Sequence, residues 1–264
     1  AEGIYHATFN PDNGKFTPSK LAAKIGSPGF LATHPNGKIL YSVGRWDEGS
    51  GALGYHIGKN GELTEFTRMI CPDGGGCHIS VHPSGKFLLT AQYGGGSVAL
   101  FPLDGNGKLG EPTVIEHTGG SKVVDRRQDS PHPHWTGFSP DGNYALIPDL
   151  GLDQIVIYKV DSSEPAISPH GVGQSVPGGG PRHMRFSTDG KFVYLLNELS
   201  LSVTTFAWDD QNGQAKRLST TPAISEKVKA GESFNSAAEI LVHPNGQFLY
   251  SSNRGHDSVS VYQT

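Results

Sequence analysis

The sequence lacks several features that stabilise or anchor other classes of protein. It contains only two cysteines, Cys71 and Cys77, and their spacing matches neither a disulfide framework nor a zinc or redox motif. No apolar run approaches the roughly 20 residues that a membrane-spanning helix needs. The first residues, AEGIYH, are too polar for a secretory signal, unless one has already been removed. We therefore expect a cytoplasmic protein that does not cross a membrane.

An excess of charge of one sign is also missing. The net charge is −4, with 21 Lys and Arg residues and 25 Asp and Glu residues interspersed along the chain. Because there is no basic stripe, no binding to nucleic acid or to a membrane surface is expected. Long helices are not expected either, since 36 glycines and 18 prolines punctuate the chain and no window shows a sustained helical period.

What the chain does contain is one phrase that returns five times. Each copy has an invariant glycine in a turn, with a short apolar stretch before it and another after it. The copies are HPNGKILY at 34–41, HPSGKFLL at 82–89, SPDGNYAL at 139–146, STDGKFVY at 187–194 and HPNGQFLY at 243–250. Self-similarity at such a period is typical of repeat architectures.

Each copy predicts a β-hairpin, because Asn-Gly, Ser-Gly or Asp-Gly between two apolar strands is a strong hairpin signal. Two further strands follow in most units, for example at 97–101 and 154–158. Four short strands per unit, repeated radially, predict an all-β fold, a β-propeller of four-stranded antiparallel blades with about five blades present. The repeat runs without a linker or a shift in composition, so residues 1–264 are expected to form a single domain.

The positions eight residues from each glycine carry side chains that a scaffold does not need. Antiparallel strands rise at the same rate, so residues equally far before and after a hairpin bend should lie level, at one face of the disc. The upstream positions hold Gly29, Cys77, His134, Arg182 and Ala238, and the downstream positions hold Arg45, Tyr93, Leu150, Glu198 and Arg254. The upstream strand should be the innermost of its blade, so these residues should ring the mouth of the central channel. The candidate site there consists of His134, Arg182, Glu198 and Arg254.

These four side chains favour a polar ligand, although charged residues on a propeller rim also fit solvation or ion pairs between blades. The positions seven residues before the glycine, on the alternate side of the strand, hold His78, Trp135, His183 and Glu239, which we expect to support or pack. Additional contacts to a substrate are expected from His132, His78, Tyr93 and Arg45.

The third unit is longer than the first, with glycine spacings of 57 and 48 residues. The excess lies in GGSKVVDRRQDSPHPHW, where Pro133 forces an extended backbone between His132 and His134. A His-x-His pair can bind a metal, but no third ligand of matching type is evident and two arginines facing it would repel a cation. General acid/base chemistry by a histidine is therefore favoured, without a metal or another cofactor. The arginines of this segment lie in a loop that either covers the site or runs between blades.

Other catalytic motifs are missing from the sequence. It has no GxSxG elbow, no HExxH and no Walker loop, so serine hydrolase, zincin and P-loop chemistry have no support. The PGGGPRH stretch at 177–183 resembles a phosphate cradle only superficially, because no helix is predicted after it. Its expected role is to bring the backbone close and deliver Arg182 to the channel.

At these residues the chain resembles the lactonase-type seven-bladed β-propeller family, which contains bacterial 6-phosphogluconolactonases and fungal carboxy-cis,cis-muconate lactonizing enzymes. The matching phrases are CHISVHPSGKFLLTAQYGGGSV, RQDSPHPHW, SPDGNYALIPDLGLDQIVIY, PGGGPRHMRFSTDGKFVYLLNELSLSV and AEILVHPNGQFLYSSNRGHDSVSVY. They cover most of residues 70–264. The resemblance implies that the family's catalytic set corresponds to the four residues that the repeat spacing selects.

The chain is shorter than the resemblance implies. Family members usually begin with a further strand and continue for about two more hairpin units, so we expect truncation at both ends. The consequence is either an opening between the first and last blades or pairing with another chain there, because exposed strand edges favour self-association.

The resemblance implies a metal-independent lactonase that opens a sugar-acid lactone, most specifically 6-phosphogluconolactone. His134 or Glu198 would act as general base, and the two arginines would bind an anionic group and stabilise the oxyanion. One alternative is a muconate-type cycloisomerase that uses the same residues. Another is a non-catalytic propeller that binds a partner on its rim.

Overall fold

The computed structural model describes residues 2–264 and confirms the predicted all-β propeller. Four antiparallel sheets have four strands and a fifth has three. Blade 1 contains β5 (Leu31–Thr33), β6 (Ile39–Trp46), β7 (Gly49–Ile57) and β8 (Leu63–Ile70). Blade 2 contains β9 (His78–Val81), β10 (Phe87–Gln92), β11 (Ser97–Pro102) and β12 (Thr113–Glu116). Blade 3 contains β13 (Gly137–Phe138), β14 (Tyr144–Asp149), β15 (Gln154–Asp161) and β16 (Ala166–Gln174).

Two further blades and a short N-terminal segment make up the remaining elements. Blade 4 contains β17 (Pro181–Phe186), β18 (Phe192–Asn197), β19 (Ser202–Asp209) and β20 (Gln214–Pro222). Blade 5 contains β21 (Ser236–Val242), β22 (Phe248–Arg254) and β23 (Ser258–Gln263). Near the N-terminus, β1 (Gly3–His6) pairs with β4 (Lys20–Lys24), and β2 (Phe9–Asn10) pairs with β3 (Lys15–Phe16). The sequence pattern missed one short helix, α1 (Glu226–Gly231), which Ser225 caps by accepting a hydrogen bond from the Val228 N–H.

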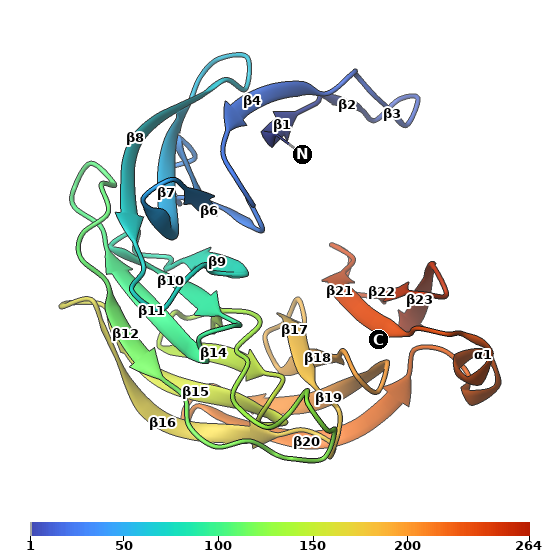
Figure 1. The fold of residues 1–264 in the computed structure, drawn as a ribbon. Coiled ribbons are helices and arrows are strands. Elements are labelled where there is room, and N and C mark those ends of the chain that lie inside the picture. Colours follow the sequence, from blue (N-terminus) through green and yellow to red (C-terminus); the bar gives the residue numbers. More distant parts are fainter. Residues whose placement is uncertain (1) are drawn as a thin grey trace.

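Blades 1 to 5 follow one another around a crescent (Figure 1), with β9, β17 and β21 toward its centre and β8, β12, β16 and β20 at its periphery. In blades 2, 4 and 5 this arrangement confirms that the strand upstream of the glycine is the innermost. In blades 1 and 3 the corresponding strands, β5 and β13, are edge strands of their sheets. The ring is open between blade 5 and the strands near the N-terminus. Among the described residues, no helix is long and apolar enough to cross a membrane.

The five repeat glycines occupy equivalent bends. Their φ angles lie between 69° and 76°, a region that residues with a side chain seldom adopt. In every copy the glycine N–H donates to the carbonyl three residues earlier, at 2.8 to 3.0 Å. This equivalence confirms the fold prediction drawn from the repeat. The glycines are Gly37, Gly85, Gly142, Gly190 and Gly246.

The histidines of two of the phrases, HPNG at 34–37 and HPSG at 82–85, each join one blade to the next. The Nε2–H of His34 donates to the carbonyl of Gly85 at 3.1 Å, and the Nε2–H of His82 donates to the carbonyl of Gly142 at 2.9 Å. Both bonds run from the bend of one blade to the bend of the following blade. These two histidines are therefore structural, and they tie blades 1, 2 and 3 together at the face of the hairpin bends.

This contact predicts different costs for two substitutions at equivalent glycines. Gly37→Ala places a methyl group in open space, so only the positive φ opposes it, at about 1–2 kcal/mol. Gly85→Ala meets the same φ and also places the methyl 2.6 Å from His34 Nε2, which must move and lose its hydrogen bond. We expect the larger drop in the urea unfolding midpoint for Gly85→Ala. Equal drops would show that the His34–Gly85 bond does not stabilise the blade interface.

The hydrophobic core is divided among the blade interfaces. Strands such as β10 and β14 are buried on both faces, so alternate residues pack toward opposite neighbouring blades. In β10, Leu88 packs with blade 1, whereas Phe87 and Leu89 pack with blade 3. Leu196 of β18 and Leu249 of β22 belong to the corresponding cluster between blades 4 and 5. Each blade is thus fixed by its neighbours, and residues at the strand ends keep defined positions.

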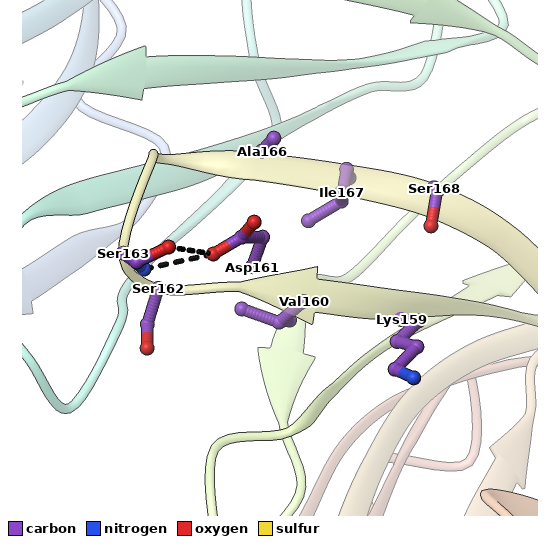
Figure 2. A pocket seen from close by; sticks show the side chains of 8 residues that line it. All are labelled: Lys159, Val160, Asp161, Ser162, Ser163, Ala166, Ile167 and Ser168. Atoms are coloured by element: carbon purple, nitrogen blue, oxygen red, sulfur yellow. Dashed lines mark hydrogen bonds between the residues drawn. The ribbon is translucent and has the colours of Figure 1, made fainter.

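A pocket of about 530 Å³ lies at the hairpin between β15 and β16. Figure 2 shows side chains that line it, such as Lys159 and Ser168. Asp161 accepts hydrogen bonds there from the N–H and hydroxyl of Ser163, at 2.9 and 2.6 Å. These bonds stabilise the turn. Because successive strands are antiparallel, this turn lies at the same face of the disc as the bend at Gly142. His134 precedes β13 and lies at the opposite face. The pocket is a feature of the hairpin and not part of the candidate site.

Candidate active site

The structure brings the four predicted site residues together at one mouth of the channel. His134 precedes β13, Arg182 lies near the start of β17, Glu198 follows β18 directly, and Arg254 ends β22. These positions are the ends of inner hairpins from blades 3, 4 and 5. The hairpins bend at one face of the disc, at the repeat glycines, so their open ends meet at the opposite face.

Glu198 is the centre of the cluster. Its Oε2 lies 2.8 Å from Arg182 Nε, 3.4 Å from Arg254 Nη2 and 3.8 Å from His134 Nε2. Its Oε1 lies 2.8 Å from Nη2 of a third arginine, Arg127. The Glu198 side chain is 7% exposed and that of Arg182 is 14% exposed, whereas that of Arg254 is 44% exposed. One buried carboxylate therefore faces three guanidinium groups, which gives the cluster a net positive charge.

Arg182 reaches Glu198 because of a β-bulge. The expectation that residues equally far from the bend lie level did not allow for this bulge. Pro181 pairs with Asn197 and His183 pairs with Leu196, so Arg182 has no partner in the ladder. A bulge of this kind redirects a side chain out of the regular alternation. A similar irregularity in β21 pairs Arg254 with Ser236 instead of Ala238. The expectation that equal offsets lie exactly level is therefore wrong by one to two residues, although the offsets did select neighbouring side chains.

The main chain of Glu198 also links two blades. Its N–H donates to the carbonyl of Gly180 at 2.7 Å, just before β17. Its carbonyl accepts a hydrogen bond of 3.1 Å from the N–H of Ala237 in β21 of blade 5. The position of the carboxylate is consequently set by the interface between blades 4 and 5, not by one hairpin alone.

The charge state of Glu198 follows from its contacts. Burial by itself would raise the pKa of this carboxyl, but the hydrogen bond from Arg127 and the charge of Arg182 outweigh burial and hold the pKa below its usual value. His134 and Arg254 act in the same direction. Glu198 is therefore ionised at neutral pH, and both of its oxygens face positively charged groups.

His134 has the opposite character. Burial and the charge of Arg182 lower the pKa of its imidazole to about 3, so the ring is neutral at physiological pH. Its side chain is 13% exposed. A neutral imidazole can accept a proton, and its Nε2 faces the Glu198 carboxylate, which stabilises the imidazolium once it forms. The site therefore contains a neutral base beside a fixed negative charge.

Sequence reasoning did not select Cys77, although it occupies the position equivalent to His134 in blade 2. Its Sγ lies 3.8 Å from His134 Nδ1 and 3.6 Å from the carbonyl oxygens of Pro133 and His134. Burial raises the pKa of this thiol to about 12, so it stays protonated. Cys77 therefore acts as a neutral neighbour that packs against His134, not as a thiolate nucleophile.

Two of the residues expected to contact the substrate lie beside the cluster. The ring of Tyr93 stacks on His132 at 4.6 Å and meets His134 edge-on at 5.2 Å, and its hydroxyl accepts a hydrogen bond of 3.4 Å from Arg127 Nη2. The Nδ1–H of His132 donates to the carbonyl of Tyr93 at 2.8 Å. Together these contacts form one wall of the site, between blades 2 and 3.

The other two expected residues lie elsewhere. Arg45 is exposed and lies next to the last residue of β6 in blade 1. Among the described residues its side chain has no ion pair or hydrogen bond. His78 is buried, with its ring 3.9 Å from that of Phe30 and 5.3 Å from that of Trp135. It lines a separate cavity of about 490 Å³ in the channel, which also contains Arg185. The structure therefore places His78 behind the site, where residues on the alternate side of the strand were expected to support it.

The loop between β12 and β13 supplies Arg127, which the sequence placed in a loop that either covers the site or runs between blades. Its neighbour Gln128 is completely buried, and Gln128 Nε2 donates to the Leu150 carbonyl at 2.8 Å and to Asp153 Oδ1 at 2.6 Å. Asp153 also accepts hydrogen bonds from the N–H groups of Gly178 and Gly180, at 2.7 and 2.9 Å. One buried carboxylate thus holds both this loop and the segment that leads to Arg182.

Chemically, the cluster can bind an anion and move a proton. The guanidinium groups offer charge-assisted donors, and His134 offers a neutral acceptor. Among residues 2–264, no group of three or more His, Cys, Asp or Glu side chains gathers in a way suited to a metal ion.

Comparison with known proteins identifies the family to which the chain belongs. The chain is 35% identical to 6-phosphogluconolactonase of Bacillus subtilis over 265 residues, covering 100% of this chain and 74% of that protein. It is 33% identical to a 6-phosphogluconolactonase of Formosa agariphila, covering 98% of this chain and 74% of that protein. The structure of the periplasmic gluconolactonase of Pseudomonas aeruginosa superposes with a TM-score of 0.89 at 29% identity, over 100% of this chain and 75% of that one. The family model "Lactonase, 7-bladed beta-propeller" matches residues 1–264, and the chain therefore belongs to this family.

Proposed function

We propose that this protein hydrolyses a sugar-acid lactone, with 6-phosphogluconolactone as its substrate. The observation that carries the proposal is the convergence of three arginines on Glu198 beside the neutral imidazole of His134. The relatives that share the fold and the family are named for lactone hydrolysis, two of them for the phosphorylated substrate. The pentose phosphate pathway is the metabolic context that this activity implies.

Lactone hydrolysis needs an activated water and stabilisation of a tetrahedral oxyanion. His134 takes a proton from water as its oxygen attacks the lactone carbonyl, and the nearby Glu198 carboxylate stabilises the imidazolium that results. Arg182 or Arg254 donates to the carbonyl oxygen as it gains negative charge. When the bond from the carbonyl carbon to the ring oxygen breaks, the ring oxygen takes the proton back from His134 and the product is the open-chain acid.

Glu198 is less suited to the role of general base than His134. Both of its oxygens contact guanidinium groups, which occupy the positions from which the carboxylate would accept a proton. We therefore assign Glu198 to orienting the arginines and stabilising the protonated imidazole. The sequence left the choice between the two residues open, and we propose His134.

The pH dependence of the reaction tests the assignment of the base. His134 acts in its neutral form, and because its pKa is lowered to about 3, that form persists far below the usual titration range of histidine. We expect kcat/KM to stay level as the pH falls from 7 to about 4, and to decrease only below that. The measurement uses an unphosphorylated sugar lactone, so that ionisation of a phosphate does not intervene. A decrease centred near pH 6.5 would contradict a buried, neutral His134.

The proposed activity is tested with a panel of phosphorylated and unphosphorylated sugar lactones and a muconate-type diacid, each followed with and without a chelator. Hydrolysis of the phosphorylated lactone that chelation does not change is the expected result. Cyclisation of the diacid without lactone hydrolysis would move the assignment to the cycloisomerase. Activity lost on chelation and restored by a divalent ion would make His132 and His134 candidates for metal ligands.

A further inference from the structure

We propose that Arg127 is a specificity-determining residue, which binds the anionic group of the substrate in exchange for its bond to Glu198. This inference rests on the proposed lactonase activity and deepens it. It concerns a residue of the loop between β12 and β13 that lies outside the four-residue set selected from the repeat.

Arg127 has donors to spare, as does Arg254, which bonds Ser236 and Ala237 through Nη2 alone. Its two side-chain hydrogen bonds, to Glu198 Oε1 at 2.8 Å and to Tyr93 Oη at 3.4 Å, both come from Nη2. Its Nε and Nη1 make no hydrogen bond among the described residues, and its side chain is 38% exposed. Arg182, in contrast, is 14% exposed and uses separate nitrogens for Glu198 and for the Ala238 carbonyl. Arg127 can therefore present a fork of N–H groups to a ligand that enters from solvent.

The position of Arg127 is fixed by the loop that carries it. The buried side chain of Gln128 bonds Leu150 and Asp153 through its nitrogen, and its oxygen accepts from the Val124 N–H at 3.0 Å. The backbone around Arg127 is thus held by the contacts of Gln128 with Val124, Leu150 and Asp153. Because the loop is already ordered, a ligand that binds the Arg127 guanidinium does not have to order the backbone as well. This favours a role of Arg127 in recognising a ligand.

The charges in the cluster favour a dianionic group. Three guanidinium groups and one carboxylate give a net charge of +2 while His134 is neutral. A phosphate monoester carries about −1.5 to −2 at neutral pH, so it matches this excess, whereas an unphosphorylated lactone leaves it uncompensated. When the phosphate takes Arg127, Glu198 Oε1 loses the hydrogen bond that helps to hold the pKa of this carboxyl low, so the pKa of Glu198 rises.

The test compares Arg127→Ala with Arg126→Ala in the same loop. Arg126 is a matched control, because its side chain is 90% exposed and its one ion pair is to Asp125. Kinetics are measured on a phosphorylated sugar lactone and on its unphosphorylated counterpart. For Arg127→Ala we expect KM for the phosphorylated lactone to rise about ten- to a hundredfold, the scale of one lost charge-assisted contact. KM for the unphosphorylated lactone should change little, and Arg126→Ala should behave as the wild type on both.

Two outcomes would overturn the proposal. An equal loss of kcat on both lactones, with KM unchanged, would mean that Arg127 only holds Glu198 in place. Wild-type kinetics for Arg127→Ala would mean that it does neither. The thermal unfolding midpoint of each variant is measured alongside, and Arg127→Lys, which keeps the charge but loses the fork, replaces the alanine variant if that one does not fold.

Failure of the proposed function would look different. If the wild type hydrolyses no lactone, binding of 6-phosphogluconate and of inorganic phosphate is measured by calorimetry on the wild type and on Arg127→Ala. Weaker binding of 6-phosphogluconate to the variant supports the role of Arg127 in anion recognition even then. Equal affinity for both proteins would overturn it.

Discussion

Replacing Glu198 with glutamine is expected to lower lactone turnover by about 10²-fold or more, because it disables the proton transfer that His134 performs, and losing such a step has this effect. The amide has the size of the carboxyl but cannot neutralise three guanidinium groups. It also cannot stabilise the imidazolium of His134 that forms as water attacks. Single-turnover and steady-state kinetics should both show the loss in kcat. His134→Ala should produce a loss of the same order, because it removes the base itself.

Glu239→Gln provides the matched control for Glu198→Gln. Glu239 is another carboxylate that pairs with cationic or ionisable groups, but its partners are His183 at 3.1 Å and Arg185 at 3.0 Å, and it has no ion pair with the cluster. Turnover by this variant should stay within a few-fold of the wild type. Similar large losses for both glutamine variants, or a fall of the unfolding midpoint that explains the loss, would remove the basis for a specific role of Glu198.

Arg182→Ala is expected to have the second large effect, a loss in kcat/KM of about 10²- to 10³-fold, as for removal of one oxyanion donor. Its guanidinium is the most buried of the three, and it bonds both Glu198 and the Ala238 carbonyl. The variant should raise KM as well as slow the reaction, because a positioned guanidinium serves binding and oxyanion stabilisation together.

Arg254→Ala should show the same pattern on a smaller scale. Arg254 is more exposed than Arg182, and it lies 3.4 Å from Glu198. Arg45→Ala, at the equivalent strand end of blade 1, should leave kinetics nearly unchanged. A larger effect from Arg45→Ala than from Arg182→Ala would show that the substrate lies over blade 1 and not at the cluster.

The repeat made most of the fold predictable. Each invariant glycine marks a bend that only a positive φ allows, and the apolar stretches around it can bury both faces only between neighbouring blades. These requirements are local and return in every copy, so five phrases sufficed to predict the blades and their inner hairpins. The sequence pattern did not predict the helix at Glu226–Gly231, because six residues are too few to show a helical period.

The candidate site was predictable only in part. His134, Arg182, Glu198 and Arg254 stand out because each departs from the repeat at the same offset. Arg127 comes from a loop with no repeat counterpart, so nothing in the periodic pattern specified where it would lie. The nine-residue excess before His134 was the available signal, and it indicated an inserted loop but not its path. The bulge at Arg182 was equally hidden, since it depends on how the β17 strand meets its neighbours.

The hydrogen bonds of the Glu198 backbone have a mechanical consequence. Blade 4 and blade 5 are joined at this point through the residue that also holds the charge balance of the site. Any rotation that opens the seam between the two blades must break the bond from Ala237 and carry the carboxylate away from Arg254. The angle between the two blades and the charge contacts of Glu198 are therefore coupled. A substitution of an apolar residue in the interface between blades 4 and 5 can change this angle, and with it proton transfer, although it alters no polar atom.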